Sequence, residues 1–134
     1  MPPETLSTAG VLLITVPTIA FGGLMLLTHI MRNVPGYLDN PVRQNLWRAG
    51  HAHAGVLVLF SLVALFYIDQ THWGEGLQRL TRLLIVSSPI LMPLGFFLSV
   101  VRPSDTKPNK LIWLTVLGGV FLAAGTLLLG IGLI

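Results

Sequence analysis

Four long stretches of the chain contain no charged residue and are mostly apolar. They cover residues 5–31, 49–68, 83–101 and 111–134, and every Asp, Glu, Lys and Arg lies outside them. A helix needs about 20 mostly apolar residues to cross the hydrocarbon core of a bilayer, and each stretch reaches about that length. The pattern predicts one domain, residues 1–134, with four transmembrane helices at approximately 6–31, 47–68, 80–101 and 110–133.

Short linkers separate the four predicted helices. The first linker contains Pro35, Gly36 and Pro41, and the third contains Pro103 and Pro108. Proline cannot donate a backbone hydrogen bond and Pro-Gly pairs favour turns, so these segments end the helices before them. Connections this short place consecutive helices antiparallel. The expected fold is therefore all-α, an integral membrane up-down four-helix bundle.

The composition excludes several classes of protein. Charged residues make up 10% of the chain and the mean hydropathy is +0.79, whereas a soluble domain carries about 25% charged residues. The absence of cysteine excludes disulfides, cysteine-ligated zinc and iron–sulfur clusters. Although the pI is near 10.0, the basic residues flank the apolar stretches and form no groove-sized patch, so no nucleic-acid partner is expected.

The distribution of basic residues predicts an orientation in the membrane. The first and third linkers share one face, and the second linker and both termini share the other. Six basic residues lie on the first face, Arg32, Arg43, Arg48, Arg102, Lys107 and Lys110, against Arg79 and Arg82 on the second. Basic residues in short loops favour the cytoplasmic side, so the first face is expected to be cytoplasmic and both termini outside.

Two histidines stand near the predicted cytoplasmic start of the second helix. Ionisable residues in a membrane segment are costly and usually face protein or water. At about 100° per residue, His51 and His53 point roughly 160° apart, so one regular helix cannot aim both at one ion. His51 shares its face with Arg48 and Gly55, which favours an inward position against the first helix, with His53 pointing sideways. The alternative is that both are interfacial residues bonded to nearby carbonyls.

A third histidine lies at the same predicted depth. His29 is near the end of the first helix, and Met25 precedes it by one turn on the same face. Imidazole with thioether suits haem iron or copper. The candidate cofactor-binding residues are therefore His51, His29 and Arg48, with His29, His51, His53 and Met25 as candidate metal ligands. His29 and His51 are expected to form one site, although a lone methionine at this spacing is more often a core or lipid-facing side chain.

The third and fourth helices each carry a further signal. Pro89 and Pro93 deprive the carbonyls of Ile85 and Pro89 of their usual donors. Ser87 and Ser88 could satisfy these carbonyls locally, or a kink could widen the bundle for a ligand. The fourth helix is rich in small residues, with Gly119 and Ala123 in a small-xxx-small pair. This pattern is typical of close packing within a bundle and equally of a homodimer or a docking surface for a larger complex.

Two segments carry a resemblance to known proteins. Residues 46–55 (LWRAGHAHAG) and 92–98 (MPLGFFL) resemble small uncharacterised four-helix bacterial membrane proteins, which implies a bacterial cytoplasmic (inner) membrane location but no activity. Arg48 and His51 also resemble the Arg-x-x-His stretch in the second helix of haem–copper oxidase and nitric oxide reductase catalytic subunits, where the histidine ligates a haem. The chain lacks the later helices that supply the other ligands, so oxidase or reductase activity is not implied.

Three function classes follow. The first is a histidine-centred site near the cytoplasmic interface that binds haem b or a transition metal such as copper. The second is a non-catalytic accessory subunit that docks through the fourth helix. The third is a binder of a small hydrophobic or quinone-like molecule at the kink of the third helix. No catalytic residue is indicated, because no carboxylate lies within the four stretches, and catalysis would require a cofactor from outside the chain.

Overall fold

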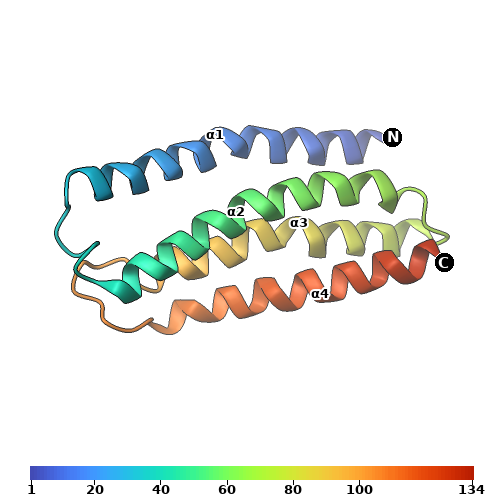
Figure 1. The fold of residues 1–134 in the computed structure, drawn as a ribbon. Helices are drawn as coiled ribbons and strands as arrows, with labels where there is room; N and C mark the ends of the chain where they lie inside the picture. Colours follow the sequence, from blue (N-terminus) through green and yellow to red (C-terminus); the bar gives the residue numbers. More distant parts are fainter.

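The computed structural model describes residues 1–134 and contains only helices, which confirms the all-α four-helix fold. The elements are α1 (Pro3–Met31), α2 (Pro41–Ile68), α3 (Glu75–Leu98), a short 3-10 helix η1 (Lys110–Ile112) and α4 (Trp113–Leu133). The helices run alternately up and down, and both termini lie at one end of the bundle (Figure 1). All four are long and apolar enough to cross a membrane.

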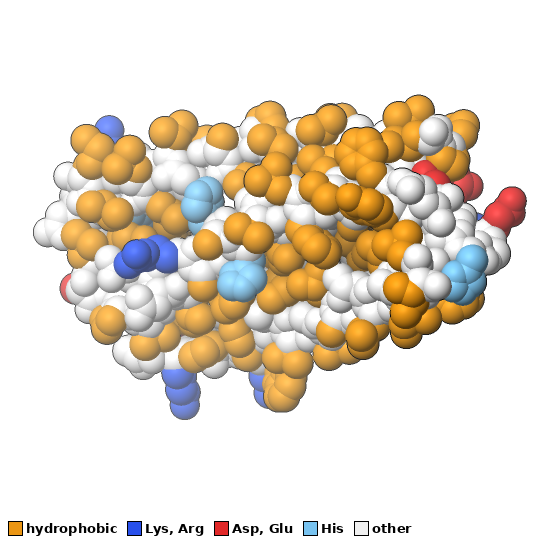
Figure 2. Space-filling model, turned by 45° about the vertical axis from the view of Figure 1, so that its right-hand side comes forward, with side chains coloured by type: hydrophobic (Ala, Val, Ile, Leu, Met, Phe, Trp, Pro, Cys, Tyr) orange, Lys and Arg blue, Asp and Glu red, His pale blue; other side chains and the backbone are white.

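Two names are used below for the ends of the bundle. The terminal end carries both chain termini and the α2–α3 linker, and the loop end carries the α1–α2 and α3–α4 linkers (Figure 1). Figure 2 shows apolar side chains along the length of one face, with acidic side chains gathered at its right-hand, terminal end. A long apolar surface of this kind indicates a lipid bilayer environment.

All four helices differ from the predicted boundaries, α1 and α4 by three residues at their starts, and α2 and α3 by more. Helix α2 begins at Pro41 rather than at residue 47, and α3 runs over Glu75–Leu98 rather than 80–101. At the start of α2, the Asn40 side chain accepts a hydrogen bond from the Arg43 N–H and Pro41 occupies the first helical position. Both features favour a helix start. The sequence pattern missed these turns because they contain charged residues, which interrupt the apolar stretches but not the helices.

The four helices are not packed equally. Helix α3 packs against both α2 and α4, whereas α1 packs against α2 without backbone contact to α3 or α4. The main apolar core lies between α2, α3 and parts of α1 and α4, and consists of Leu12, Val58, Ala64, Leu65, Ile68, Ile85 and Leu129. Helix α1 is therefore the least tightly held element.

The small residues of α4 serve two different faces. A Cβ atom on Gly118 or Gly125 would press against Met92 or Ile85 of α3, so these glycines allow α3 and α4 to approach closely. A Cβ atom on Gly119 would meet no other atom. Gly119 and Ala123 instead line a shallow groove between α2 and α4. Close packing within the bundle thus explains Gly118 and Gly125. Docking of a partner through Gly119 and Ala123 stays a prediction.

Gly118→Ala is expected to lower the free energy of unfolding by about 1–3 kcal/mol. The new Cβ would lie 2.9 Å from the Met92 backbone nitrogen, so α4 must shift away from α3. The adjacent Gly119→Ala is the matched control and should leave stability unchanged or slightly raised, because alanine is the better helix former. Thermal unfolding in detergent measures both. Equal Tm values for the two variants would contradict this packing.

Candidate functional site

The ring of His51 lies against two glycines of α1. A Cβ atom on Gly23 would be 3.1 Å from both Cε1 and Nε2 of His51, and one on Gly22 would be 3.6 Å from its Nδ1. Gly22 and Gly23 therefore leave the space that the imidazole occupies. His51 faces α1, as the helical periodicity predicts. It is half-buried, and it differs from His29 and His53 in making no hydrogen bond to the protein.

A cavity of about 290 Å³ opens beside His51 between α1, α2 and α3. Its walls are largely apolar, and His51 is the one ionisable residue among them. Two threonines also line it, but the hydroxyls of Thr15 and Thr18 donate to carbonyls of their own helix at 2.6 Å. His51 is therefore the one ionisable side chain of this cavity, and its ring nitrogens have no hydrogen-bond partner in the protein.

The proline-containing segment of α3 forms one wall of the cavity. Pro89 and Pro93 both line it. The carbonyl of Ile85, which Pro89 leaves without its usual donor, accepts hydrogen bonds from Ser88 at 2.7 Å and from Ser61 of α2 at 3.4 Å. The hydrogen bond from Ser88 to this carbonyl agrees with the sequence-based expectation. Ser87 donates to the Leu83 carbonyl of its own helix. The hypothesis that a kink at these prolines widens the bundle for a ligand stays a prediction.

His53 points to a different side of α2. Its ring packs against Phe96 of α3 with a centroid separation of 5.1 Å. Its Nδ1 lies 2.7 Å from the Ala49 carbonyl oxygen, and since a carbonyl only accepts, Nδ1 carries the proton. The sideways position predicted for His53 is therefore correct.

His29 belongs to an aromatic cluster at the loop end. Its ring packs edge-on against Tyr37 and Trp47, with centroid separations of 5.4 and 5.5 Å. Its Nδ1 donates to the Met25 carbonyl at 2.8 Å. The Met25 side chain packs on the apolar cluster that contains Tyr37, Trp47 and Leu26. Met25 therefore supports the aromatic cluster through its side chain and orients His29 through its backbone.

The structure does not assemble the candidate ligands into one set. No hydrogen bond or ring contact joins two histidines, and no group of three His, Cys, Asp or Glu side chains is close enough to hold a metal ion. His51 meets α1 roughly 10 Å along the helix axis from His29, given a rise of about 1.5 Å per residue. Arg48 is exposed. The predicted joint site of His29 and His51 therefore lacks direct contact between its members.

Arg43 has a structural role that sequence analysis missed. It is buried and donates to the carbonyls of Gly36 at 2.9 Å, Val100 at 3.2 Å and Val101 at 3.2 Å. Its guanidinium also lies 3.8 Å from the centre of the Trp47 ring. Arg43 thus joins the α1–α2 linker to the end of α3. The sequence pattern does not reveal this role, because Arg43 follows the prolines of the first linker, where membrane-flanking arginines are typical topology signals.

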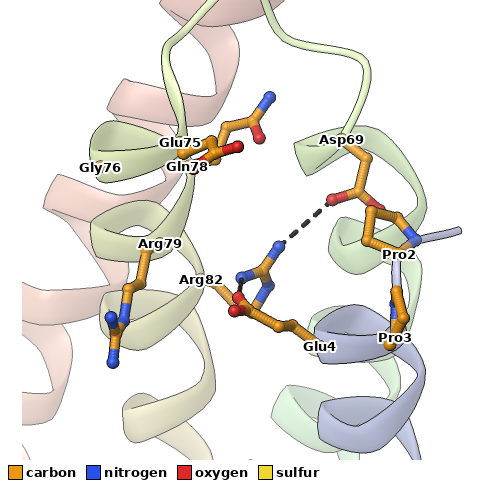
Figure 3. Close-up of a pocket in the computed structure, with 9 residues that line it drawn as sticks. All are labelled: Pro2, Pro3, Glu4, Asp69, Glu75, Gly76, Gln78, Arg79 and Arg82. Atoms are coloured by element: carbon orange, nitrogen blue, oxygen red, sulfur yellow. Dashed lines mark hydrogen bonds and ion pairs between the residues drawn. The ribbon is translucent and has the colours of Figure 1, made fainter.

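A second missed arginine connects α1 to α3 at the terminal end. Arg82 donates to Glu4 at 3.1 Å, to Asp69 at 3.2 Å and to the Thr5 hydroxyl at 3.0 Å. Thr5 in turn donates to Asp69 at 3.0 Å. Figure 3 shows Arg82 between Glu4 and Asp69. This network is the polar connection between the start of α1 and the rest of the bundle.

Tyr37→Phe is expected to leave the free energy of unfolding unchanged near neutral pH, because the buried Tyr37 hydroxyl has no hydrogen-bond partner to lose. Burial raises the pKa of the Tyr37 phenol above its ordinary value of 10.0, although Arg48 and Arg43 oppose this shift. The folded state therefore keeps the proton longer than the unfolded state, and stability falls as pH rises from about 10 through the raised pKa.

Denaturation of wild type and Tyr37→Phe at about pH 8 and pH 11 measures this difference. The variant should lose less stability than wild type at the higher pH. An equal loss in both proteins would show that the phenol does not contribute to the alkaline sensitivity.

No known protein family, curated protein or solved structure matches the chain. The resemblance to small four-helix bacterial membrane proteins, and that of Arg48 and His51 to the haem–copper oxidase helix, therefore remain predictions. The candidate function therefore depends on the geometry of the cavity and of His51 beside it.

Proposed function

We propose that this protein binds a small hydrophobic molecule with a polar, quinone-like head in the cavity between α1, α2 and α3. The observation that carries the proposal is His51, whose ring nitrogens make no protein hydrogen bond beside an otherwise apolar cavity. An ionisable residue is costly inside a membrane segment and usually has a functional role there.

The chemistry of the cavity suits such a head group. A neutral imidazole offers one N–H donor and one nitrogen acceptor, so His51 can donate to a quinone carbonyl or accept from a hydroquinone hydroxyl. The volume of about 290 Å³ is just below the range for small-molecule sites, about 300–1,000 Å³. This size favours a single ring system, with any long tail outside the cavity.

The packing of α1 provides a route for the ligand. Because α1 contacts α2 without backbone contact to α3, the α1–α3 side of the cavity is the least closed. A hydrophobic molecule dissolved in the bilayer can reach His51 from this side without crossing water. The proposed ligand is therefore one that partitions into lipid.

Titration with short-chain probes tests the proposal. Purified protein in detergent is mixed with a short-chain naphthoquinone or benzoquinone, and tryptophan fluorescence is followed, since Trp47 packs against Phe97 of the cavity wall. Saturable quenching is expected, with release by an excess of a redox-inactive aromatic competitor. Quenching that rises linearly with probe concentration would contradict a defined site.

Haem or a transition metal such as copper is a second candidate. His29 and His53 each donate Nδ1–H to a backbone carbonyl, which leaves Nε2 with a free lone pair, as in metal-ligating histidines. An absorption spectrum and metal determination on the purified protein test this candidate. A Soret band or stoichiometric metal, lost in His53→Ala or His29→Ala, would support it over the quinone-like ligand.

We further propose that both termini lie outside the cytoplasmic membrane of a bacterium. Six basic residues flank the loop end against two at the terminal end, and both termini share one end. A C-terminal fusion to a reporter active only in the cytoplasm should therefore be silent, whereas a fusion of a reporter active only outside should be active. The reverse pattern would place the His51 cavity in the outer half of the membrane.

A further inference from the structure

The gap between α1 and α3 continues from the His51 cavity to the terminal end. A second cavity of about 450 Å³ shares Val86 and Ile90 with the His51 cavity. This second cavity also shares Glu4, Arg79 and Arg82 with a third cavity of about 630 Å³ at the terminal end. We call these three adjoining cavities the α1–α3 seam. They form one path whose lining changes from apolar to charged.

The cavity at the terminal end is lined entirely by non-hydrophobic residues. It lies between the start of α1, the end of α2 and the first turns of α3 (Figure 3). Arg82 is 9% exposed and already paired, but its Nε is buried without a partner. Arg79 is exposed, forms no ion pair and points along α3, away from the Arg82 ion pairs (Figure 3). Arg79 is therefore a free cation at the junction of two cavities.

The charges of this cavity favour a zwitterion over an anion. Three carboxylates, Glu4, Asp69 and Glu75, face two guanidinium groups, Arg79 and Arg82, so the local balance is negative. Arg79 can bind a phosphate oxygen through charge-assisted hydrogen bonds. The exposed carboxylates of Glu4 and Glu75 can accept from a primary ammonium. A purely anionic head group could also bind Arg79, but the excess of carboxylates in this cavity would repel it.

The length and lining of the seam fit one acyl chain. From Arg82 to Pro93 along α3, a rise of about 1.5 Å per residue gives roughly 16 Å, close to half of the ~30 Å hydrocarbon core. Leu83, Val86 and Ile90 line this part of the seam. A chain that starts below Arg79 would therefore pass Val86 and Ile90 and extend into the His51 cavity, which Pro93 also lines.

We propose that the α1–α3 seam binds a glycerophospholipid with a phosphoethanolamine head, its phosphate at Arg79, its ammonium at Glu75 and Glu4, and one acyl chain between α1 and α3. The lipid head lies at the terminal end, and the acyl chain reaches the His51 cavity where the two cavities share Val86 and Ile90. The proposal goes beyond the quinone-like ligand and stands if that ligand is not found.

Native mass spectrometry of the full chain in detergent tests the lipid site. The delipidated protein is offered equal amounts of palmitoyl-oleoyl phosphatidylethanolamine, phosphatidylcholine and phosphatidylglycerol. One phosphatidylethanolamine should be retained several-fold more than either other lipid, because only its head pairs phosphate with a hydrogen-bonding ammonium. Equal retention of all three, or preference for phosphatidylglycerol, would overturn the proposal.

Two variants locate the head group. Arg79→Gln should weaken retention of phosphatidylethanolamine about tenfold, the effect of losing one charge-assisted contact. Arg102→Gln is the matched control, since Arg102 is exposed at the loop end and likewise forms no ion pair. Glu75→Gln should reduce the preference over phosphatidylglycerol. If Arg79→Gln and Arg102→Gln retain the lipid equally, the head does not lie at Arg79.

Soluble phosphoethanolamine separates a lipid site from a simple head-group site. The soluble compound should fail to displace the bound lipid at equal concentration, because it lacks the chain that occupies the seam. Displacement as effective as that by the intact lipid would overturn the assignment of the acyl chain to the space between α1 and α3.

Discussion

His51→Phe is expected to weaken binding of a short-chain quinone by about 5-fold to 150-fold. Phenylalanine keeps the ring that packs on Gly22 and Gly23 but has no nitrogen to hydrogen-bond the head group. Loss of one such bond in an apolar cavity costs about 1–3 kcal/mol, and 1.4 kcal/mol corresponds to tenfold. Fluorescence titration of purified wild type and variant gives the ratio of dissociation constants.

The other histidines supply the controls for this prediction. His53 packs on Phe96, and His29 packs on Tyr37 and Trp47, so neither lines the cavity. His53→Phe should therefore change quinone affinity less than about twofold, below 0.5 kcal/mol. His29→Phe should behave likewise. A loss in either control as large as that in His51→Phe would show that the histidines act together, as the sequence-based hypothesis of a joint site expected.

Arg43→Ala is expected to give the largest loss of stability of any substitution considered, about 3 kcal/mol or more. Three carbonyls would lose a charged donor inside the protein, and Trp47 would lose its cation–π partner. Arg43→Lys should recover only part of this loss, because an ammonium cannot reproduce the planar, multiply donating guanidinium. Chemical or thermal denaturation in detergent measures the series.

Arg48→Ala is the matched control for Arg43. Both arginines belong to the first turns of α2, but Arg48 is exposed. It should therefore change the free energy of unfolding by no more than about 0.5 kcal/mol. Equal Tm values for Arg43→Ala and Arg48→Ala would contradict the conclusion that the hydrogen bonds of Arg43 stabilise the linkers at the loop end.

The apolar pattern was sufficient to predict the fold. Uncharged stretches of about 20 residues and proline-containing linkers leave few arrangements other than an up-down bundle. Helical periodicity also predicted the opposite directions of His51 and His53, because a helix fixes the angle between side chains two residues apart. The helix starts were predicted less accurately. Helix α2 begins at Pro41, after the Asn40 cap, although charged residues follow within its first turns.

The candidate site was harder to predict, because it depends on how the helices approach one another. The sequence places His29 and His51 at similar depth in the membrane. The apolar pattern does not show that His29 packs on Tyr37. Nor does it show that the ring of His51 packs against Gly22 and Gly23. These contacts depend on the rotation and tilt of α1. The roles of Arg43 and Arg82 were missed for a related reason, since membrane-flanking arginines serve both as topology signals and as buried donors.

Photolabelling tests most directly the central claim that a hydrophobic ligand binds between α1 and α3 beside His51. A photoreactive azido-quinone is cross-linked to purified protein, and labelled peptides are identified by mass spectrometry. We predict labels within residues 11–22 of α1 and 86–97 of α3, the segments that line the cavity, with labelling suppressed by excess unlabelled quinone and in His51→Phe. Labels concentrated on α4, or labelling that competitor does not reduce, would contradict the account.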